Sequence, residues 1–169
     1  MDMRLDQSIQ AAIKHISGPA DTFMWCSPCT GGSQRQIFNI HKAFETGNLG
    51  TLYKIRGHRE LHEQLKRPFF MIAEHAIKVG ARVIHEWPDG CLYWDDPDYV
   101  EFFEKHGFKH TRFDGCMYGL VAAFGKGKGL PIKKPWRIAA SNLPLHTGSR
   151  GVVVGPRRTP RGRAAMLVW

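Results

Sequence analysis

Two short apolar segments separated by helical patterns set the strongest limit on what this chain can fold into. Residues 22–26 and 81–87 are rich in aromatic and apolar side chains, and a turn containing proline and glycine follows each of them. Helical patterns over residues 34–44 and 59–79 lie between the two segments. Strands that alternate with helices are typical of an α/β domain whose first strands are parallel.

The rest of the chain extends this pattern. Further helices are expected over residues 6–17 and 98–106, and further strands over residues 108–113, 116–124 and 136–140. Asp96 and Pro97 are expected to start the helix at residue 98, and Pro68 is expected to kink or break the long helix. The closing run of strands predicts an antiparallel hairpin at one edge of the sheet.

Composition limits the kind of protein. With 169 residues, 43% of them hydrophobic and 23% charged, the chain has the size and balance of one globular domain. No apolar run approaches the roughly 18 residues of a membrane span, so no membrane partner is expected. The N-terminal residues lack the apolar region of a signal peptide, and the four cysteines lack the spacing of a disulfide framework. These features predict an intracellular protein, in the cytoplasm or the nucleus.

Charge is divided unevenly along the sequence. Residues 1–114 hold 14 Lys and Arg and 15 Asp and Glu, whereas residues 115–169 hold 10 Lys and Arg and no acid. An acid-free basic segment is typical of a surface that binds nucleic acid, although a solvated basic tail has the same composition. We therefore expect one domain over residues 1–146, followed by a basic, poorly ordered tail over residues 147–169.

Cys26 ends the first predicted strand and Cys29 lies just past it, before a glycine turn and a helix. A turn exposes a thiol, and a helix N-terminus lowers its pKa, so this position suits a nucleophile. The sequence Trp-Cys-Ser-Pro-Cys of residues 25–29 resembles the site of the thioredoxins, which implies a dithiol oxidoreductase as one alternative. The two cysteines also have the spacing of half a zinc site, but no second pair of ligands accompanies them, so no metal ion is predicted.

A second resemblance involves Cys29 together with an acid further along the chain. Residues 28–33, Pro-Cys-Thr-Gly-Gly-Ser, resemble the Pro-Cys-x-x-x-Ser loop of the DNA cytosine-5 methyltransferases. In that family the next strand of the sheet ends in a Glu, and Glu86 holds that place here. The succession of short motifs over about residues 20–143 is similar to that of a divergent methyltransferase-like domain.

The resemblance implies a chemistry for these residues. The Cys29 thiolate would attack carbon 6 of a cytosine flipped out of DNA, and Glu86 would hydrogen-bond ring nitrogen 3. S-adenosylmethionine would supply the methyl group. The substrate-binding residues would be Pro28, Ser33, Trp87 and Pro88, and the nucleic-acid-binding residues would be Lys126, Lys128, Lys133, Lys134 and Arg137.

The part of such enzymes that holds the cofactor has no counterpart in the sequence. About twenty residues precede the first predicted strand, and they contain one helix but no strand with a glycine-rich turn. The Gln-x-Arg-x-Arg pattern of the family is absent, and Trp87 follows Glu86 where the family usually has Asn. The sequence therefore predicts a partial Rossmann-like methyltransferase sheet with an antiparallel hairpin at one edge and without the cofactor-binding N-terminal half. A partner chain or a further segment would complete the cofactor site. A basic nucleic-acid-binding module without enzymatic activity is the remaining alternative.

Overall fold

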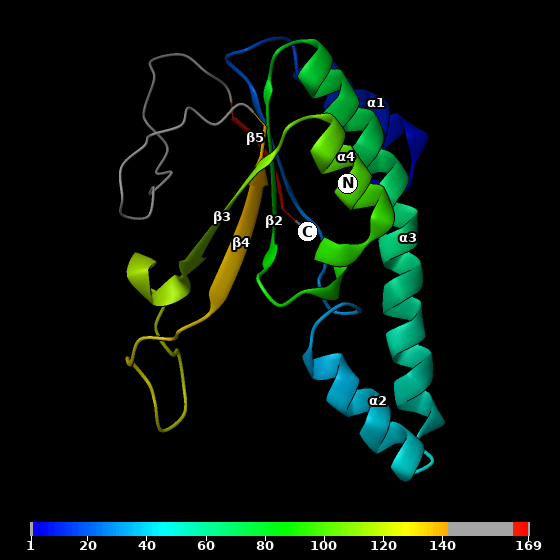
Figure 1. Ribbon diagram of the computed structural model, residues 1–169, viewed down its shortest axis with the longest axis vertical. Helices are drawn as coiled ribbons and strands as arrows, with labels where there is room; N and C mark the ends of the chain where they lie inside the picture. Colours follow the sequence, from blue (N-terminus) through cyan, green and yellow to red (C-terminus); the bar gives the residue numbers. More distant parts are fainter. Residues whose placement is uncertain (1, 142–163, 169) are drawn as a thin grey trace.

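Helices and strands alternate along the chain, as the sequence predicts for an α/β domain. The computed structural model describes residues 2–141 and 164–168 (Figure 1). Its elements are α1 (Asp6–His15), β1 (Thr22–Cys26), α2 (Arg35–Glu45), α3 (Leu49–Lys78), β2 (Arg82–Pro88), the 3-10 helix η1 (Leu92–Asp95), α4 (Pro97–Lys105), β3 (Lys109–Asp114), the 3-10 helix η2 (Gly115–Tyr118), β4 (Pro135–Ala140) and β5 (Ala164–Val168). No helix among the described residues is long and apolar enough to span a lipid bilayer.

A mixed sheet forms the centre of the fold, with the strands in the order β3-β4-β2-β1-β5. Strand β1 pairs in parallel with β2 and with β5, whereas β4 is antiparallel to both β2 and β3. The expected parallel pair and the expected antiparallel strands at one edge are both present. Because β1 and β2 run in the same direction, their carboxyl ends meet at one end of the sheet.

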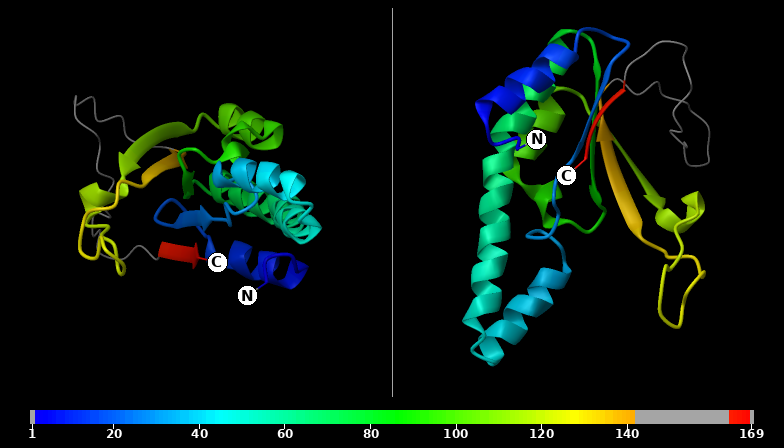
Figure 2. Two further views of the ribbon diagram at one scale, coloured as in Figure 1. Left: turned by 90° about the horizontal axis from the view of Figure 1, so that it is seen from below. Right: turned by 180° about the vertical axis from the view of Figure 1, so that it is seen from behind.

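Helices α1, α3 and α4 lie on the same face of the sheet, whereas α2 extends beyond the end of the sheet and packs against α3 (Figures 1 and 2). The strand residues fully buried on that face are Phe23, Trp25, Val83, His85, Trp87 and Ala139. They pack against aromatic side chains of α3 and α4, above all Phe69, Tyr99 and Phe103. Successive side chains of a strand point to opposite faces, so the neighbours of these residues, Cys26 and Glu86 among them, face away from the helices.

Helix α4 forms where the sequence predicts it. The Asp96 side chain accepts a hydrogen bond from the backbone N–H of Asp98 at 3.1 Å, and Pro97 occupies the first turn, where its missing N–H costs nothing.

Helix α3 differs from the prediction in its start and in its continuity. It begins at Leu49, because the Asn48 side chain caps its first turn. It also continues through Pro68, so a break at that residue was wrongly predicted. Pro68 is buried, and Leu65 and Phe69 on either side of it keep the apolar stripe of the helix in the core. This packing outweighs the backbone hydrogen bond that proline removes.

The strand predicted over residues 116–124 is absent. The chain forms η2 there and then turns at Gly119, whose φ of 79° lies in the left-handed region. Met117 and Tyr118 are 67% and 50% exposed, so the alternating pattern has no buried face to support a strand. The segment from residue 115 to residue 134 is instead a long connection between β3 and β4, called the β3–β4 loop below.

The expected tail is described only in its last part. Residues 164–168 form β5 and pair with β1, which the sequence did not predict. The rest of that segment, residues 147–163 and 169, lies outside the described residues.

Candidate active site

Cys26 and Glu86 lie side by side at the carboxyl ends of β1 and β2. The parallel register pairs Trp25 with His85, so the next residue of each strand points to the face without helices. The Cys26 thiol and the Glu86 carboxyl group influence each other's pKa. Burial, together with the neighbouring Glu86, raises the pKa of Cys26 to about 12.

Glu86 is a half-buried acid on β2, and its surroundings shift its pKa. Burial raises its pKa, while the neighbouring Cys26 thiol and the positive charge of Lys134 act in the opposite direction. Its Oε1 atom is shielded from solvent and has no hydrogen-bond partner among the described residues. A buried carboxyl oxygen without a partner is costly, and a raised pKa favours the form that carries a proton. Glu86 can therefore hold a proton that a bound ligand would share.

Cys29 lies three residues further along, in the loop after β1, and lines a small pocket. The pocket has a volume of about 180 Å³. Its lining residues are Cys29, Ser33, Gln34, Pro88, Gly90, Cys91, Lys134 and Pro135. They come from the loops that follow β1 and β2 and from the start of β4, so the pocket lies at the carboxyl ends of the two parallel strands, where α/β sheets bind their ligands.

Two charged groups near Cys29 shift its pKa in opposite directions. Burial raises the pKa of the Cys29 thiol, and the negative charge of Glu86 adds to this effect, whereas the positive charge of Lys134 lowers it. The ammonium group of Lys134 lies 4.0 Å from the centre of the Trp136 ring. This cation–π contact holds the lysine beside the pocket. Lys134 is therefore the cation that can stabilise a Cys29 thiolate.

The two glycines after Cys29 are required by the packing of Tyr93. A Cβ atom on Gly32 would lie 2.8 Å from the ring of Tyr93, which no real side chain tolerates. The backbone N–H of Gly32 donates to the carbonyl of Cys29 at 3.1 Å, and the Gly32 carbonyl accepts from Leu92 at 2.8 Å. The Gly-Gly pair thus lets η1 press against the loop and fixes the position of Cys29.

The other residues expected at the substrate site separate into two groups. Ser33 and Pro88 line the pocket, and Pro28 is half buried in the loop beside Cys29. The expectation for Trp87 is wrong. Trp87 is fully buried on the helical face, where its Nε1–H donates to the carbonyl and to the Oγ of Ser27 at 3.1 and 3.0 Å. The strand alternation that places Glu86 and Pro88 on the face without helices turns Trp87 toward the helices.

The basic residues expected to contact phosphates also differ in their placement. Lys126 and Lys128 are exposed on the β3–β4 loop, and Lys133 is exposed near Asp114, at 3.9 Å. Arg137 does not join Lys134, because its register partner is Trp87 and it therefore faces the helices. The contacts of Arg137 are the Trp94 ring, at 4.6 Å, and the His110 Nδ1, at 3.0 Å.

Cys91 is a pocket residue that was not predicted. It follows the turn after β2, much as Cys29 follows the end of β1, and its backbone pairs with that of Ser33 in an isolated antiparallel bridge. Burial raises the pKa of Cys91 to about 12, and Cys29 adds to the shift. The equivalent positions of the two cysteines after parallel strands could have indicated that they meet.

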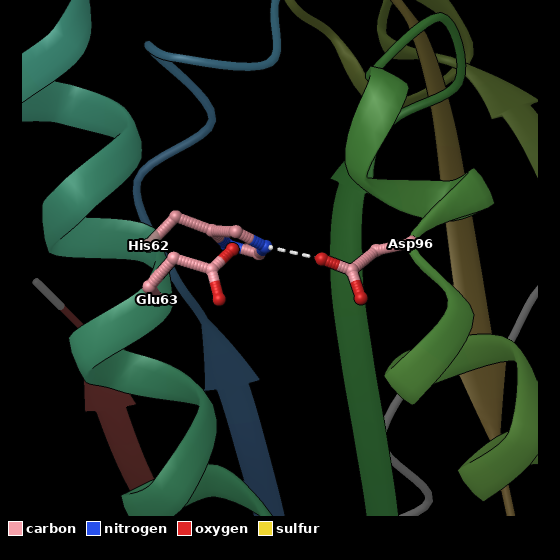
Figure 3. Close-up of side chains that lie close together, drawn as sticks. All are labelled: His62, Glu63 and Asp96. Atoms are coloured by element: carbon pink, nitrogen blue, oxygen red, sulfur yellow. Dashed lines mark hydrogen bonds and ion pairs between the residues drawn. The ribbon is translucent and has the colours of Figure 1, made fainter.

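A second cluster of polar groups lies at the opposite side of η1. His62 and Glu63 on α3 and Asp96 before α4 bring three possible ligand atoms within 4.8 Å of one another (Figure 3). The His62 Nε2 lies 3.1 Å from the Asp96 Oδ2, and the His62 ring stacks on Tyr93 at 3.5 Å between centroids. The ammonium of Lys66 lies 2.9 Å from Glu63 and 2.8 Å from Asp96. Because this cation already neutralises the acids, the cluster is better explained as a structural link between α3 and α4 than as a metal site.

Comparison with known proteins gives no relative on which to rest a function. The chain matches no family model, no curated protein and no solved structure. Function is therefore argued from the site alone.

Proposed function

We propose that this chain carries the catalytic half of a DNA cytosine-5 methyltransferase-like domain, with Cys29 as the nucleophile and Glu86 as the proton-holding acid. The observation that carries the proposal is the meeting of Cys29, Glu86 and Lys134 at the carboxyl ends of two neighbouring parallel strands. Addition to a cytosine ring needs these three functions: a sulfur nucleophile, a proton donor to the ring, and a cation that offsets the developing negative charge.

The chemistry of the proposal follows from the groups present. The sulfur of Cys29 forms a bond to carbon 6 of the cytosine, and the electron pair of the ring's 5,6 double bond moves toward carbon 5 and the ring. The proton of Glu86 is shared with ring nitrogen 3, so the ring accepts this charge. A carboxylic acid whose pKa is raised by burial suits this role, because it keeps its proton at a higher pH than an exposed Glu would. Lys134 favours loss of the proton from the thiol.

The described residues do not fit S-adenosylmethionine. The residues before β1 form α1 and a turn, and the strand on the outer side of β1 is β5, from the C-terminal end of the sequence. Neither provides a strand followed by a glycine-rich turn at a helix N-terminus, which is where such a cofactor is held. The proposal therefore assigns nucleophilic attack and proton sharing to this chain, and assigns no methyl-transfer step to its described residues.

The dithiol alternative is less well supported by the site. A dithiol site needs both thiols to react, whereas burial, together with Glu86, raises the pKa of Cys26 to about 12. Helix α2 begins at Arg35, six residues after Cys29, so no helix N-terminus stabilises either thiolate. Cys26 also neighbours Glu86, and a carboxylate at this place opposes thiolate formation.

The proposal is tested by hydrogen exchange at carbon 5 of cytosine, which needs no methyl donor. Addition of Cys29 makes carbon 5 nucleophilic, so it takes a deuteron from deuterated water. Reversal of the addition then expels the thiolate and leaves deuterium in the DNA. We expect mass spectrometry of the DNA nucleosides to show exchange with the wild type and a loss of at least about 100-fold with Cys29→Ser or Glu86→Gln. Cys116→Ser, a change outside the pocket, serves as the control. Exchange that survives in Cys29→Ser would exclude Cys29 as the nucleophile.

A further inference from the structure

A helical hairpin projects from the molecule beside the pocket. It consists of α2 and the first part of α3, residues 35–60, and extends beyond the sheet at the carboxyl ends of β1 and β2 (Figures 1 and 2). Ser33 and Gln34, which directly precede α2, line the Cys29 pocket. The hairpin therefore begins at the wall of the pocket and continues its surface outward.

Large apolar side chains are unusually exposed on this hairpin. Phe38 is 76% exposed, Phe44 70%, Tyr53 69% and Leu49 61%. The two helices bury small side chains such as Ala43 against each other, so the aromatic rings are not needed to hold the hairpin together. Exposed aromatic rings gathered on one element mark a surface that binds something.

The charges on the hairpin indicate what it binds. Residues 35–60 hold five Lys and Arg against two acids, Glu45 and Glu60. Arg35, Lys42 and Lys54 form no ion pair with any residue that the structure describes. On α2, Arg35, Phe38 and Lys42 follow one another at spacings of three and four residues, which place them on one face of the helix. Unpaired cations interleaved with exposed aromatic rings fit a nucleic-acid strand, since phosphates bind the cations and bases stack on the rings.

A second surface of the same kind lies across the pocket. The β3–β4 loop projects from the same end of the molecule (Figure 1). It exposes Lys126, Lys128 and Phe124, the last at 86%, and it contains no acid. Lys134, at the end of this loop, lines the pocket as Gln34 does on the side of the hairpin.

We propose that the helical hairpin is a second nucleic-acid-binding surface, and that a strand bound to it and to the β3–β4 loop crosses the mouth of the Cys29 pocket. The inference rests on the proposed function for the identity of the ligand, DNA. A protein partner is less well supported, because lysines are depleted at the centres of protein–protein interfaces.

The test compares the affinities of hairpin variants for a fluorescent DNA oligonucleotide, single-stranded and as a duplex, over a series of salt concentrations. The charge variant is Lys42→Gln with Lys54→Gln, and the aromatic variant is Phe38→Ala with Tyr53→Ala. The matched control is Lys14→Gln with Lys78→Gln, which removes the same charge from exposed positions on α1 and at the far end of α3. Phe38, Lys42, Tyr53 and Lys54 lie on the hairpin, whereas Lys14 and Lys78 lie outside it. Circular dichroism checks that each variant folds.

We expect the charge variant to reduce the slope of log K against log salt by about 1 to 2, and the control to leave it within about 0.5. The aromatic variant should bind single strands at least about fivefold more weakly at an unchanged slope. Equal losses in the charge variant and the control would overturn the inference, since net charge alone would then explain binding. Unchanged DNA affinity in the aromatic variant, accompanied by loss of a dimer in light scattering, would overturn it in favour of a protein interface.

The outcome can be separated from that of the proposed function. If hairpin variants bind DNA like the wild type while cytosine exchange still depends on Cys29, the hairpin inference is wrong and the proposed chemistry stands. If the hairpin variants lose DNA affinity while the wild type shows no exchange, the binding surface stands and the proposed chemistry is wrong.

Discussion

The Cys26 thiol and the Glu86 carboxyl group are neighbours at the carboxyl ends of the parallel strands β1 and β2, and Glu86 raises the pKa of Cys26. This arrangement leaves the buried Oε1 atom of Glu86 without a hydrogen-bond partner among the described residues. It also separates the roles of the two cysteines, because Cys26 is held against an acid while Cys29 lies at the pocket with Lys134. Cys29 is therefore the better nucleophile of the pair.

The first prediction concerns the bond that fixes the loop after β1. Trp87→Phe keeps an aromatic ring but removes the Nε1–H that donates to Ser27, together with part of the buried indole. The free energy of unfolding should fall by at least about 1–2 kcal/mol, because a buried acceptor loses its donor and a small cavity is left. Equilibrium unfolding in urea measures the change. Tyr53→Phe, at a position that is 69% exposed, should change it by less than about 0.5 kcal/mol; an equal loss in both variants would contradict the role of Trp87.

A second prediction concerns the dependence of stability on pH. His85 is fully buried, and both ring nitrogens lack partners among the described residues. Burial, assisted by the charges of His62 and His110, lowers its pKa well below the usual 6.5. The folded protein therefore keeps His85 neutral, whereas the unfolded chain binds a proton below about pH 6.5. The free energy of unfolding should consequently fall as the pH drops below that value.

His85→Phe isolates this contribution. Burial also lowers the pKa of His62, so the wild type should lose stability with acid through both residues. Between pH 7 and pH 5, the free energy of unfolding should fall less steeply with acid in the variant. The difference in slope should correspond to at most one bound proton. Unfolding in urea at several pH values measures it, and parallel curves for wild type and variant would show that His85 is not the group responsible.

The third prediction concerns the cluster beside η1. The Lys66 side chain is 14% exposed and contacts Asp96, Asp98 and Glu63 at 2.8 to 2.9 Å. Burial opposes its charge, but these hydrogen bonds outweigh burial and raise the pKa of Lys66. Lys66→Met should cost about 2 kcal/mol, because it leaves the poorly exposed Asp96 without its cation.

Metal ions should not bind to the same cluster in the wild type. The Lys66 ammonium occupies the position between the acids, so added Mg²⁺ or Zn²⁺ should not raise the thermal midpoint. A rise in the wild type that is lost in Asp96→Asn would instead identify a metal site.

Local signals in the sequence predict several elements correctly. The cap at Asp96, the apolar segments that become β1 and β2, and the turns after them are properties of neighbouring residues. Because β1 and β2 are parallel, the convergence of Cys29 and Glu86 on one end of the sheet also follows from the order of elements.

Other features depend on contacts between distant residues. The burial of Trp87 depends on which face of β2 meets the helices, and a single strand does not specify this. The continuity of α3 through Pro68 depends on its packing against the sheet, which outweighs the local preference of proline. Lys134 reaches the pocket only because β4 inserts beside β2, and β5 depends on a pairing across most of the chain.

The most direct test of the central claim is the pH profile of Cys29 alkylation by iodoacetamide, followed by peptide mass spectrometry. Only the thiolate reacts, so the midpoint of the profile reports the pKa of Cys29. Glu86→Gln removes a negative charge and should move the midpoint to lower pH, whereas Lys134→Gln removes a positive charge and should move it to higher pH. Lys133→Gln, the same change at the exposed neighbouring residue, should leave it in place. Opposite shifts in the first two variants are the result predicted if Glu86 and Lys134 both act on Cys29, and an unchanged midpoint in both would contradict the account.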